Sequence, residues 1–326
     1  MGLYYLWVEE DSREGLTFID KATTIAKEVA DYLSWWAALY QSGTFLTFMS
    51  EFNEAHQRLK KCLDFSISAN HKIGIAFSKT SISVCYQVEG NTKTSYKFAQ
   101  ETLELAKETG DAFIKGMAYA NYATSCYYKG LFDDAKTFFL EFTSSYEKSA
   151  PISWIVWAYV NLGLLLIDLG EYDEAVNRYK KIISIMEMFD FMPSVVNYYQ
   201  LFLVRAKVLR HDYDIELDEI FAFYQENKFK FCEGRMARNI GDVLLNMGDN
   251  YLTDSVAWFQ RAIEADTRNE LRWNLAEDHA CYADWFRKKG DVQGAKEQLT
   301  KAINLFRECG ADGWVTRTEK KLAELH

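Results

Sequence analysis

Apolar and small residues recur along the chain at helical spacing, in units of about 40 residues. In the second half of a unit, three positions lie at relative offsets of 0, 4 and 7, as Ala175, Tyr179 and Ile182 do. These offsets place the three side chains on one face of a helix, and the small first residue lets a neighbouring helix approach closely. The pattern therefore predicts helical hairpins that stack on one another.

The clearest unit covers residues 152–189, where two helical stretches meet at Gly170. A single hairpin of this kind cannot bury both of its faces, so copies are expected on either side of it. The chain supplies these copies in register, except that one turn comes two positions early. The turn position of successive units holds Ser50, Gly90, Gly130, Gly170, Arg210, Gly248 and Gly290.

The composition favours one extended helical array. A chain of 326 residues could hold two domains or one repeat array. It is 49% hydrophobic and 16% aromatic, with two prolines and 17 glycines, which are too few turn formers for a protein of many short strands. An all-α fold is predicted.

Three segments carry the repeat most clearly, namely Tyr119–Phe142, Tyr159–Ile182 and His279–Ala302. Each has a large residue, small residues near the end of the first helix, a turn glycine and an alanine five positions after it. This order resembles the tetratricopeptide repeat. The resemblance implies a right-handed superhelical solenoid of helical hairpins.

The same register divides the chain. Residues 1–30 are expected to form a partial N-terminal repeat, 31–310 seven hairpins of about 40 residues each, and 311–326 a C-terminal capping helix. Trp314 would cover the last hairpin while charged residues around it face water. The unit at 195–228 lacks the usual small residues, so a shorter or displaced helix is expected there.

The length of the repeat departs from the family pattern. The usual unit has about 34 residues, so the extra residues should lengthen the helices by about one and a half turns. Repeats of this length resemble the sensor regions of multidomain signalling ATPases. Only about ten residues stand where the first unit should have its first helix. This shortfall suggests either a fragment of a larger protein, with an effector domain upstream, or an atypical cap.

Charge and patterning narrow the partners and the location. The net charge is -10 and no basic stripe is present, so nucleic acid is not expected as a ligand. No apolar run is long enough to span a membrane, and the first residues lack the pattern of a signal peptide. A cytoplasmic protein is predicted. The six cysteines are scattered without a close pair, which is typical of reduced core residues.

Catalytic and cofactor signatures are absent from the sequence. No phosphate-binding glycine loop and no nucleophile elbow occurs. His279 and Cys281 point to different faces of a helix, and the acidic pair Asp133 and Asp134 suits the first turn of a helix. The sequence therefore predicts no enzymatic activity, no cofactor and no metal site.

The family resemblance implies that the first helix of each hairpin lines a concave groove. In the clearest unit the pair Leu162 and Gly163 lies in the first helix, and the position before this pair is polar in several units. It holds Gln41, Asn121, Asn161 and Asn239. A carboxamide can pair with both N–H and C=O of an extended peptide, which favours peptide contact. The alternative is that each asparagine binds the neighbouring hairpin and fixes the stacking.

Aromatic and basic residues share the predicted groove. Tyr127, Tyr128 and Trp157 lie in the middle of it, followed by Arg235 and Arg238. Such a surface suits a ligand with apolar anchors and one acidic end or side chain. The three aromatic residues could equally belong to the core.

The predicted function is protein or peptide recognition along the concave face, without catalysis, as the sensor part of a larger signalling protein. Two alternatives stay open. The chain could associate with itself through exposed aromatic residues, which light scattering across a dilution series would reveal. It could instead bind a small regulatory molecule between stacked hairpins, which an enclosed pocket would favour.

Overall fold

The computed structural model describes residues 1–188 and 192–325, and these form helices joined by short turns. Phe189 and His326, the last residues of the best predicted repeat and of the predicted capping helix, lie outside the described residues. An inner layer contains the first helix of each hairpin: α3 (Tyr32–Phe48), α5 (Lys72–Glu89), α7 (Ala112–Lys129), α9 (Ile152–Asp168), α11 (Pro193–Leu209), α13 (Lys230–Met247) and α15 (Arg272–Lys289).

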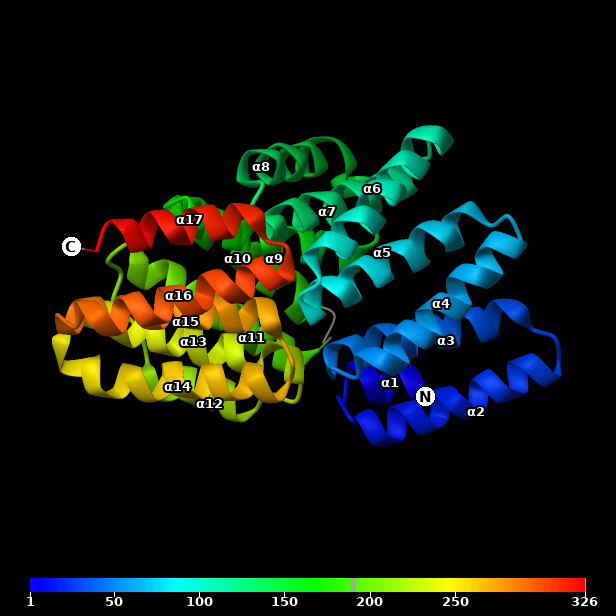
Figure 1. Cartoon of the computed structure of the whole chain (residues 1–326). Coiled ribbons are helices and arrows are strands. Elements are labelled where there is room, and N and C mark those ends of the chain that lie inside the picture. The colour runs from blue at the N-terminus through cyan, green and yellow to red at the C-terminus, as the bar shows by residue number, and fades with distance from the viewer. Residues whose placement is uncertain (189–191, 326) are drawn as a thin grey trace.

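An outer layer contains the second helices, and two further helices stand at the ends of the chain (Figure 1). The outer helices are α2 (Ser12–Glu28), α4 (Phe52–Ser68), α6 (Thr92–Thr109), α8 (Phe132–Glu141), α10 (Tyr172–Met188), α12 (Leu217–Gln225), α14 (Leu252–Arg268) and α16 (Val292–Cys309). The end helices are α1 (Gly2–Trp7) and α17 (Asp312–Ala323). The all-α solenoid is confirmed. The division of the chain into a partial repeat, seven hairpins and a capping helix remains a prediction.

Local sequence signals set the helix ends. The Asp111 carboxylate accepts a hydrogen bond from the Ile114 backbone N–H at 2.9 Å and caps the start of α7. Gly130 ends the same helix in the left-handed region at φ 83°. Helix α12 has only nine residues, so the shorter helix predicted for the unit at 195–228 is confirmed.

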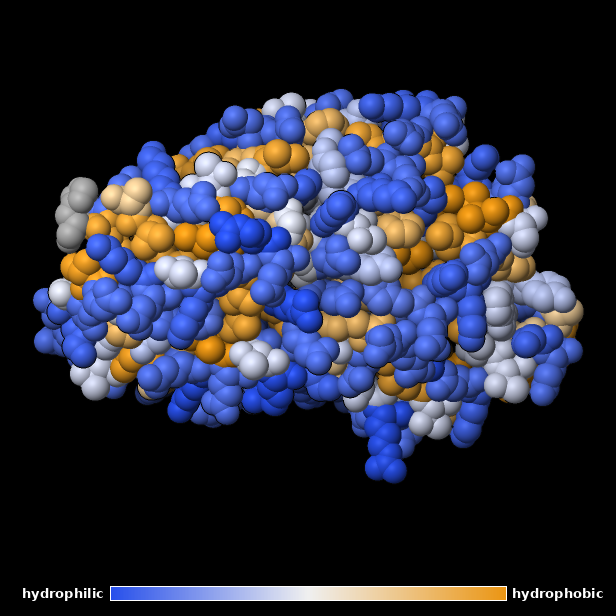
Figure 2. All heavy atoms as spheres, viewed as in Figure 1, coloured by the Kyte–Doolittle hydropathy of each residue, from blue (hydrophilic) through white to orange (hydrophobic). Residues whose placement is uncertain are grey.

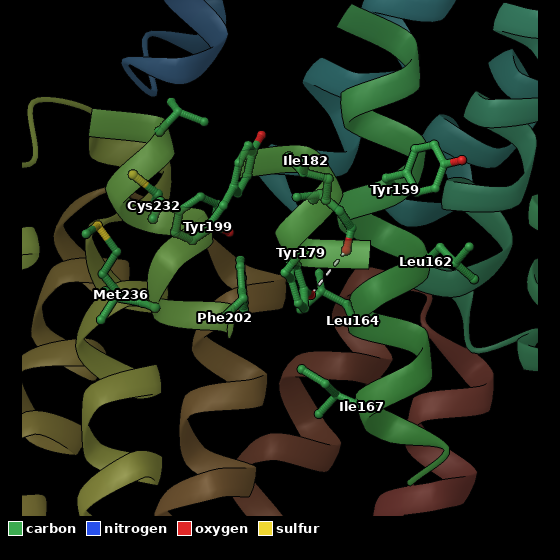
Figure 3. Close-up of a cluster of buried hydrophobic side chains, with 14 of the residues drawn as sticks. Tyr159, Leu162, Leu164, Ile167, Tyr179, Ile182, Tyr199, Phe202, Cys232 and Met236 are labelled. Atoms are coloured by element: carbon green, nitrogen blue, oxygen red, sulfur yellow. Dashed lines mark hydrogen bonds between the residues drawn. The ribbon is translucent and has the colours of Figure 1, made fainter. Parts of the chain in front are cut away.

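Packing between hairpins follows the predicted pattern of small and large residues. Tyr179 is fully buried, and a Cβ atom at Gly163 would lie 2.5 Å from its Cζ atom. The Tyr179 hydroxyl donates to the Val160 carbonyl at 3.3 Å, and its ring stacks on that of Phe202 at 5.4 Å (Figure 3). A side chain at Gly163 would displace this tyrosine, which explains why the closest approach of α9 and α10 needs a glycine.

The superhelix closes on itself, so that helices far apart in sequence share the inner layer. The Trp273 indole of α15 donates to the Tyr128 carbonyl of α7 at 3.0 Å, and the Trp314 indole of α17 donates to the Tyr127 carbonyl at 2.8 Å. Trp314 is buried and stacks on Phe306, which confirms its predicted role in covering the last hairpin. These contacts divide the concave surface into separate cavities instead of one continuous groove.

Helix α1 closes the other side of the array. Its Trp7 carbonyl accepts a hydrogen bond from the Met192 backbone N–H at 2.8 Å, and the Glu10 carboxylate accepts from the Ser194 backbone N–H at 2.9 Å. The ring of Phe45 in α3 meets that of Phe229, next to α13, at 5.7 Å. The N-terminal segment therefore links the first hairpins to the start of α11 through these hydrogen bonds.

The outer surface is mixed in polarity. On the face in Figure 2, hydrophilic side chains are spread over most of the surface and apolar atoms show between them. Among residues 1–188 and 192–325, no helix combines the length and apolar character that crossing a membrane requires.

Candidate functional site

A cavity of about 670 Å³ with a mostly apolar lining lies at the end of the superhelix that α1 covers. This volume lies within the range of small-ligand sites, about 300–1,000 Å³. None of the described residues that line it is charged. We call it the apolar cavity, and its aromatic lining residues are Tyr4, Trp7, Tyr40, Phe48, Phe77, Trp154, Trp157, Tyr199 and Phe231.

A small recess continues the apolar cavity toward the centre of the molecule. It shares Trp157, Tyr199 and Phe231 with the larger space and has a volume of about 20 Å³. About 10–15 Å³ suffices for one water-sized group. Its other lining residues are Gln87, Val88, Tyr128, Val160, Asn161, Tyr198, Arg235 and Asn274.

Arg235 is the charged residue of the recess, and its side chain is buried. Its guanidinium donates to the Tyr198 hydroxyl at 3.2 Å, to the Tyr128 hydroxyl at 3.1 Å and to the Asn274 side-chain oxygen at 2.6 Å. All three partners are neutral, and its Nε atom has no hydrogen-bond partner in the described part of the chain. Arg235 therefore holds a buried positive charge without a carboxylate in contact.

Arg238, one helical turn further along α13, is held differently. It donates to the Glu277 carboxylate at 2.6 Å and to the Asp278 carboxylate at 2.6 Å. Burial raises the pKa of the Asp278 carboxyl, and it raises that of Asp266, beside it, well above the ordinary range. Arg238 is thus part of a compensated charge cluster.

A second cavity, of about 870 Å³, lies at the opposite end between α9, α11, α13, α15 and α17. Its charges are paired: Arg205 with Asp242 at 2.6 Å, and Lys321 with Asp284 at 2.6 Å. Asp168 accepts from the Tyr127 hydroxyl at 2.7 Å, and burial raises the pKa of its carboxyl. We call this space the polar cavity.

The structure brings five of the predicted groove residues to the apolar cavity and its recess. Gln41 lines the cavity and accepts a hydrogen bond from the Trp7 indole at 3.2 Å, and Trp157 lies where cavity and recess meet. Tyr128, Asn161 and Arg235 line the recess. Trp157, Tyr128 and Arg235, three of the aromatic and basic residues predicted for the groove, therefore line the same recess.

The other predicted groove residues lie within the packed inner layer. Asn121 and Asn239 are fully buried, and their amide atoms have no hydrogen-bond partner among the described residues. Tyr127 is buried against α17, and Arg238 belongs to the charge cluster. The Asn161 amide donates to the Trp157 carbonyl of its own helix at 2.8 Å. In the described structure, these asparagines make no hydrogen bonds to a neighbouring hairpin.

Many residues that line the cavity and its recess were missed by sequence reasoning, and three of them show why. Trp7 comes from the short N-terminal helix, Phe231 from the start of α13, and Gln87 from the last turn of α5. Trp7 and Phe231 reach the cavity only because the superhelix closes, and a repeat pattern does not report closure. The signal that could have found Gln87 is a polar side chain on an inner helix, near the helix's C-terminal end.

Comparisons with known proteins agree with the fold. The model of the tetratricopeptide repeat matches residues 158–185, within α9 and α10. No curated protein sequence matches the chain. The resemblance to the tetratricopeptide-repeat family is therefore confirmed by a match to one repeat and by the helical solenoid.

Solved structures with the same architecture share little sequence with this chain. The Rap conjugation gene regulator of the plasmid pLS20, in complex with the Phr* peptide, aligns with a TM-score of 0.63 at 17% identity, over 82% of this chain and 72% of that one. A chain of the APC/C hetero-tetramer Cut9-Hcn1 aligns with a TM-score of 0.57 at 13% identity, over 95% of this chain and 53% of that one. The apo quorum sensor NprR from B. thuringiensis aligns with a TM-score of 0.50 at 14% identity, over 99% and 96%. At such identities the likeness concerns the fold.

Proposed function

We propose that this protein is a non-catalytic recognition module that binds a peptide or a peptide segment of a protein in the apolar cavity. The observation that carries the proposal is a cavity of about 670 Å³ between inner helices, with an aromatic lining and no charged lining residue among those described. Aromatic side chains in enclosed pockets supply much of the binding energy at recognition sites. The pLS20 Rap regulator, which has a similar fold, was solved with a peptide.

The cavity can be tested by filling it. Thr44 lines the apolar cavity, and its hydroxyl donates to the Tyr40 carbonyl one turn earlier. Thr300 makes the same bond to Lys296 but is exposed on α16. Thr44→Trp should abolish retention of peptides from a soluble random pool analysed by mass spectrometry, while Thr300→Trp should retain the same peptides as the wild type. Equal retention by both variants would contradict the proposal.

A second candidate is a small regulatory molecule, which the cavity volume also accommodates. The two candidates differ in the hydrogen bonds they can form. A peptide brings backbone N–H and C=O groups that can pair with the polar atoms at the inner end of the cavity. A screen of apolar metabolites by thermal shift, with Thr44→Trp as the control, would favour this candidate if a metabolite stabilises only the wild type.

We further propose that recognition serves signalling, with this module as the sensor part of a larger cytoplasmic protein. The support is the long repeat, which resembles those of signalling ATPase sensor regions. The sequence upstream in the parent gene tests this proposal, because an effector module encoded there is expected and an unrelated gene would contradict it. Self-association remains a prediction, and light scattering across a dilution series would test it.

A further inference from the structure

We infer that the recess around Arg235 binds the free C-terminal carboxylate of a peptide whose last side chains are apolar and occupy the apolar cavity. This inference rests on the proposed function and makes it specific. It predicts both the end of the peptide that enters and the chemistry of that end.

Arg235 places a positive charge at the inner end of a cavity that has no charged lining residue among those described. Arg235 is buried, keeps its positive charge, and contacts only neutral partners. Of the carboxylates nearby, Glu277 and Asp278 both bind Arg238 instead. The guanidinium Nε of Arg235 has no partner among the described residues. A buried charge is normally paired, so an anion from a ligand would complete this site.

Several polar side-chain atoms of the recess residues beside Arg235 have no hydrogen-bond partner among the described residues. Gln87 is 1% exposed and neither of its amide atoms has a hydrogen-bond partner in the described structure. The same holds for the Asn161 side-chain oxygen and the Trp157 indole N–H, and all three residues line the recess. Most buried polar side chains in native proteins are hydrogen-bonded. Several unpaired groups around one space therefore indicate that a ligand pairs with them.

The donors and acceptors around Arg235 distinguish a peptide end from other carboxylates. The Arg235 Nε–H, the Trp157 indole and the Gln87 amide nitrogen can donate to a carboxylate. The oxygens of Gln87 and Asn161 can only accept, and a fatty acid offers no N–H to them. The last peptide N–H, which lies next to the terminal carboxylate, would satisfy an acceptor. This complementarity favours a peptide over a fatty acid.

The sizes and polarities of the recess and the apolar cavity also suit a peptide end. The recess of about 20 Å³ accommodates one carboxylate oxygen, and the apolar cavity in front of it accommodates side chains. A charged residue near the C-terminus of the ligand would find no counter-ion among the described residues that line the apolar cavity. Leucine-like or aromatic residues are therefore expected at the last positions.

The test uses two arrays of hexapeptides with apolar last residues, one with free C-terminal carboxylates and one with carboxamides. The best sequence is then measured in both forms by isothermal titration calorimetry, with dodecanoate as a separate probe. The acid should bind at least about tenfold more tightly than the amide, because the ionic hydrogen bonds are lost in the amide.

Variants test the assigned residues. Arg235→Gln should reduce the acid-to-amide affinity ratio to about one, whereas Arg205→Gln, in the polar cavity, should leave the ratio unchanged. Asn161→Leu should weaken the peptide acid without weakening dodecanoate. Circular dichroism establishes that each variant is folded, and the ratio in the wild type tests the inference even if Arg235→Gln does not fold.

Three other outcomes would each contradict either this inference or the proposed function. Equal affinity of acid and amide would overturn the carboxylate inference and leave the proposed function intact. Binding of dodecanoate without any hexapeptide would overturn the peptide as the source of the carboxylate. Capture of no hexapeptide from either array, with no binding of dodecanoate, would contradict the proposed function itself.

Discussion

The apolar cavity and the polar cavity are built from neighbouring parts of the same inner layer, but they hold charge in different ways. The polar cavity has several charged side chains, and those of Arg205, Asp242, Lys321 and Asp284 pair with one another. The apolar cavity has no charged lining residue among those described, and Arg235, which contacts no carboxylate in the described structure, stands at its inner end.

This difference indicates which space is prepared for a ligand. Paired charges satisfy one another, so the polar cavity is complete without a partner. Around Arg235, in contrast, donors and acceptors have no protein partners in the described structure. Binding energy is available where polar groups are already desolvated and unpaired, because the ligand then adds bonds without a further desolvation cost to the protein.

The largest expected effect comes from disturbing the closure that separates the two cavities. A Cβ atom at Gly313 would lie 2.1 Å from the Gly130 carbonyl oxygen, where α17 meets the end of α7. Gly313→Val should lower the free energy of unfolding by about 3 kcal/mol because backbone cannot move aside easily. Urea denaturation measures this.

The control for this prediction is Gly170→Ala. Gly170 also has a positive φ, of 77°, but no heavy atom lies within 4 Å of a Cβ built there. Its cost should be only the backbone strain, about 1 kcal/mol. The closure contact would be unimportant if Gly313→Val cost no more than Gly170→Ala.

The next effect concerns the paired charges of the polar cavity. Arg205→Met leaves Asp242 without its cation at 2.6 Å and should cost about 2 kcal/mol of unfolding free energy. The double variant Arg205→Met, Asp242→Leu should recover most of this loss. Peptide affinity at the apolar cavity should stay within about twofold in both. A large loss of affinity would show that the two cavities act together.

Much of the fold could be predicted from the sequence because repeats specify local contacts. Ala175, Tyr179 and Ile182 pack as their spacing indicates, and all three are buried. Trp314 covers the last hairpin for a similar reason, since the end of an array needs an apolar cover with a polar outer side.

The closure of the superhelix, in which α15 and α17 contact α7, could not be predicted from the repeat pattern. The bonds from Trp273 to Tyr128 and from Trp314 to Tyr127 join residues 145 and 187 positions apart. Such contacts depend on the pitch accumulated over several hairpins, to which each repeat adds a small rotation. The family resemblance indicates that Asn121 and Tyr127 lie on an inner helix, and they lie on α7. Their burial depends on the closure of the superhelix and follows only from the three-dimensional structure.

A smaller effect is expected from the carboxyl pair behind Arg238. Asp266 is fully buried and its pKa is raised by burial, so the folded protein holds a proton that the unfolded chain releases above about pH 4. This group therefore lowers stability progressively as the pH rises from about 4 toward its folded-state pKa. Asp266→Asn should stabilise the protein by about 1 kcal/mol at pH 8 and by nearly nothing at pH 4. Thermal denaturation across this range measures the difference, and a gain that is independent of pH would contradict the assignment.

The smallest effect is expected at an exposed ion pair near the apolar cavity. Lys230 of α13 and Glu51 lie 2.8 Å apart, and both side chains are largely in contact with solvent. Lys230→Ala should change the free energy of unfolding by less than about 0.5 kcal/mol, and less still at high salt. A loss above about 1 kcal/mol would show that this pair, and not the aromatic contacts, holds the closure on this side.

The most direct test of the central claim is a crystal structure of the protein with the hexapeptide acid that binds most tightly. We expect peptide side chains in the apolar cavity between α1, α3 and α9, with the terminal carboxylate beside Arg235. A peptide bound in the polar cavity or on the outer helices, with the apolar cavity empty, would contradict it.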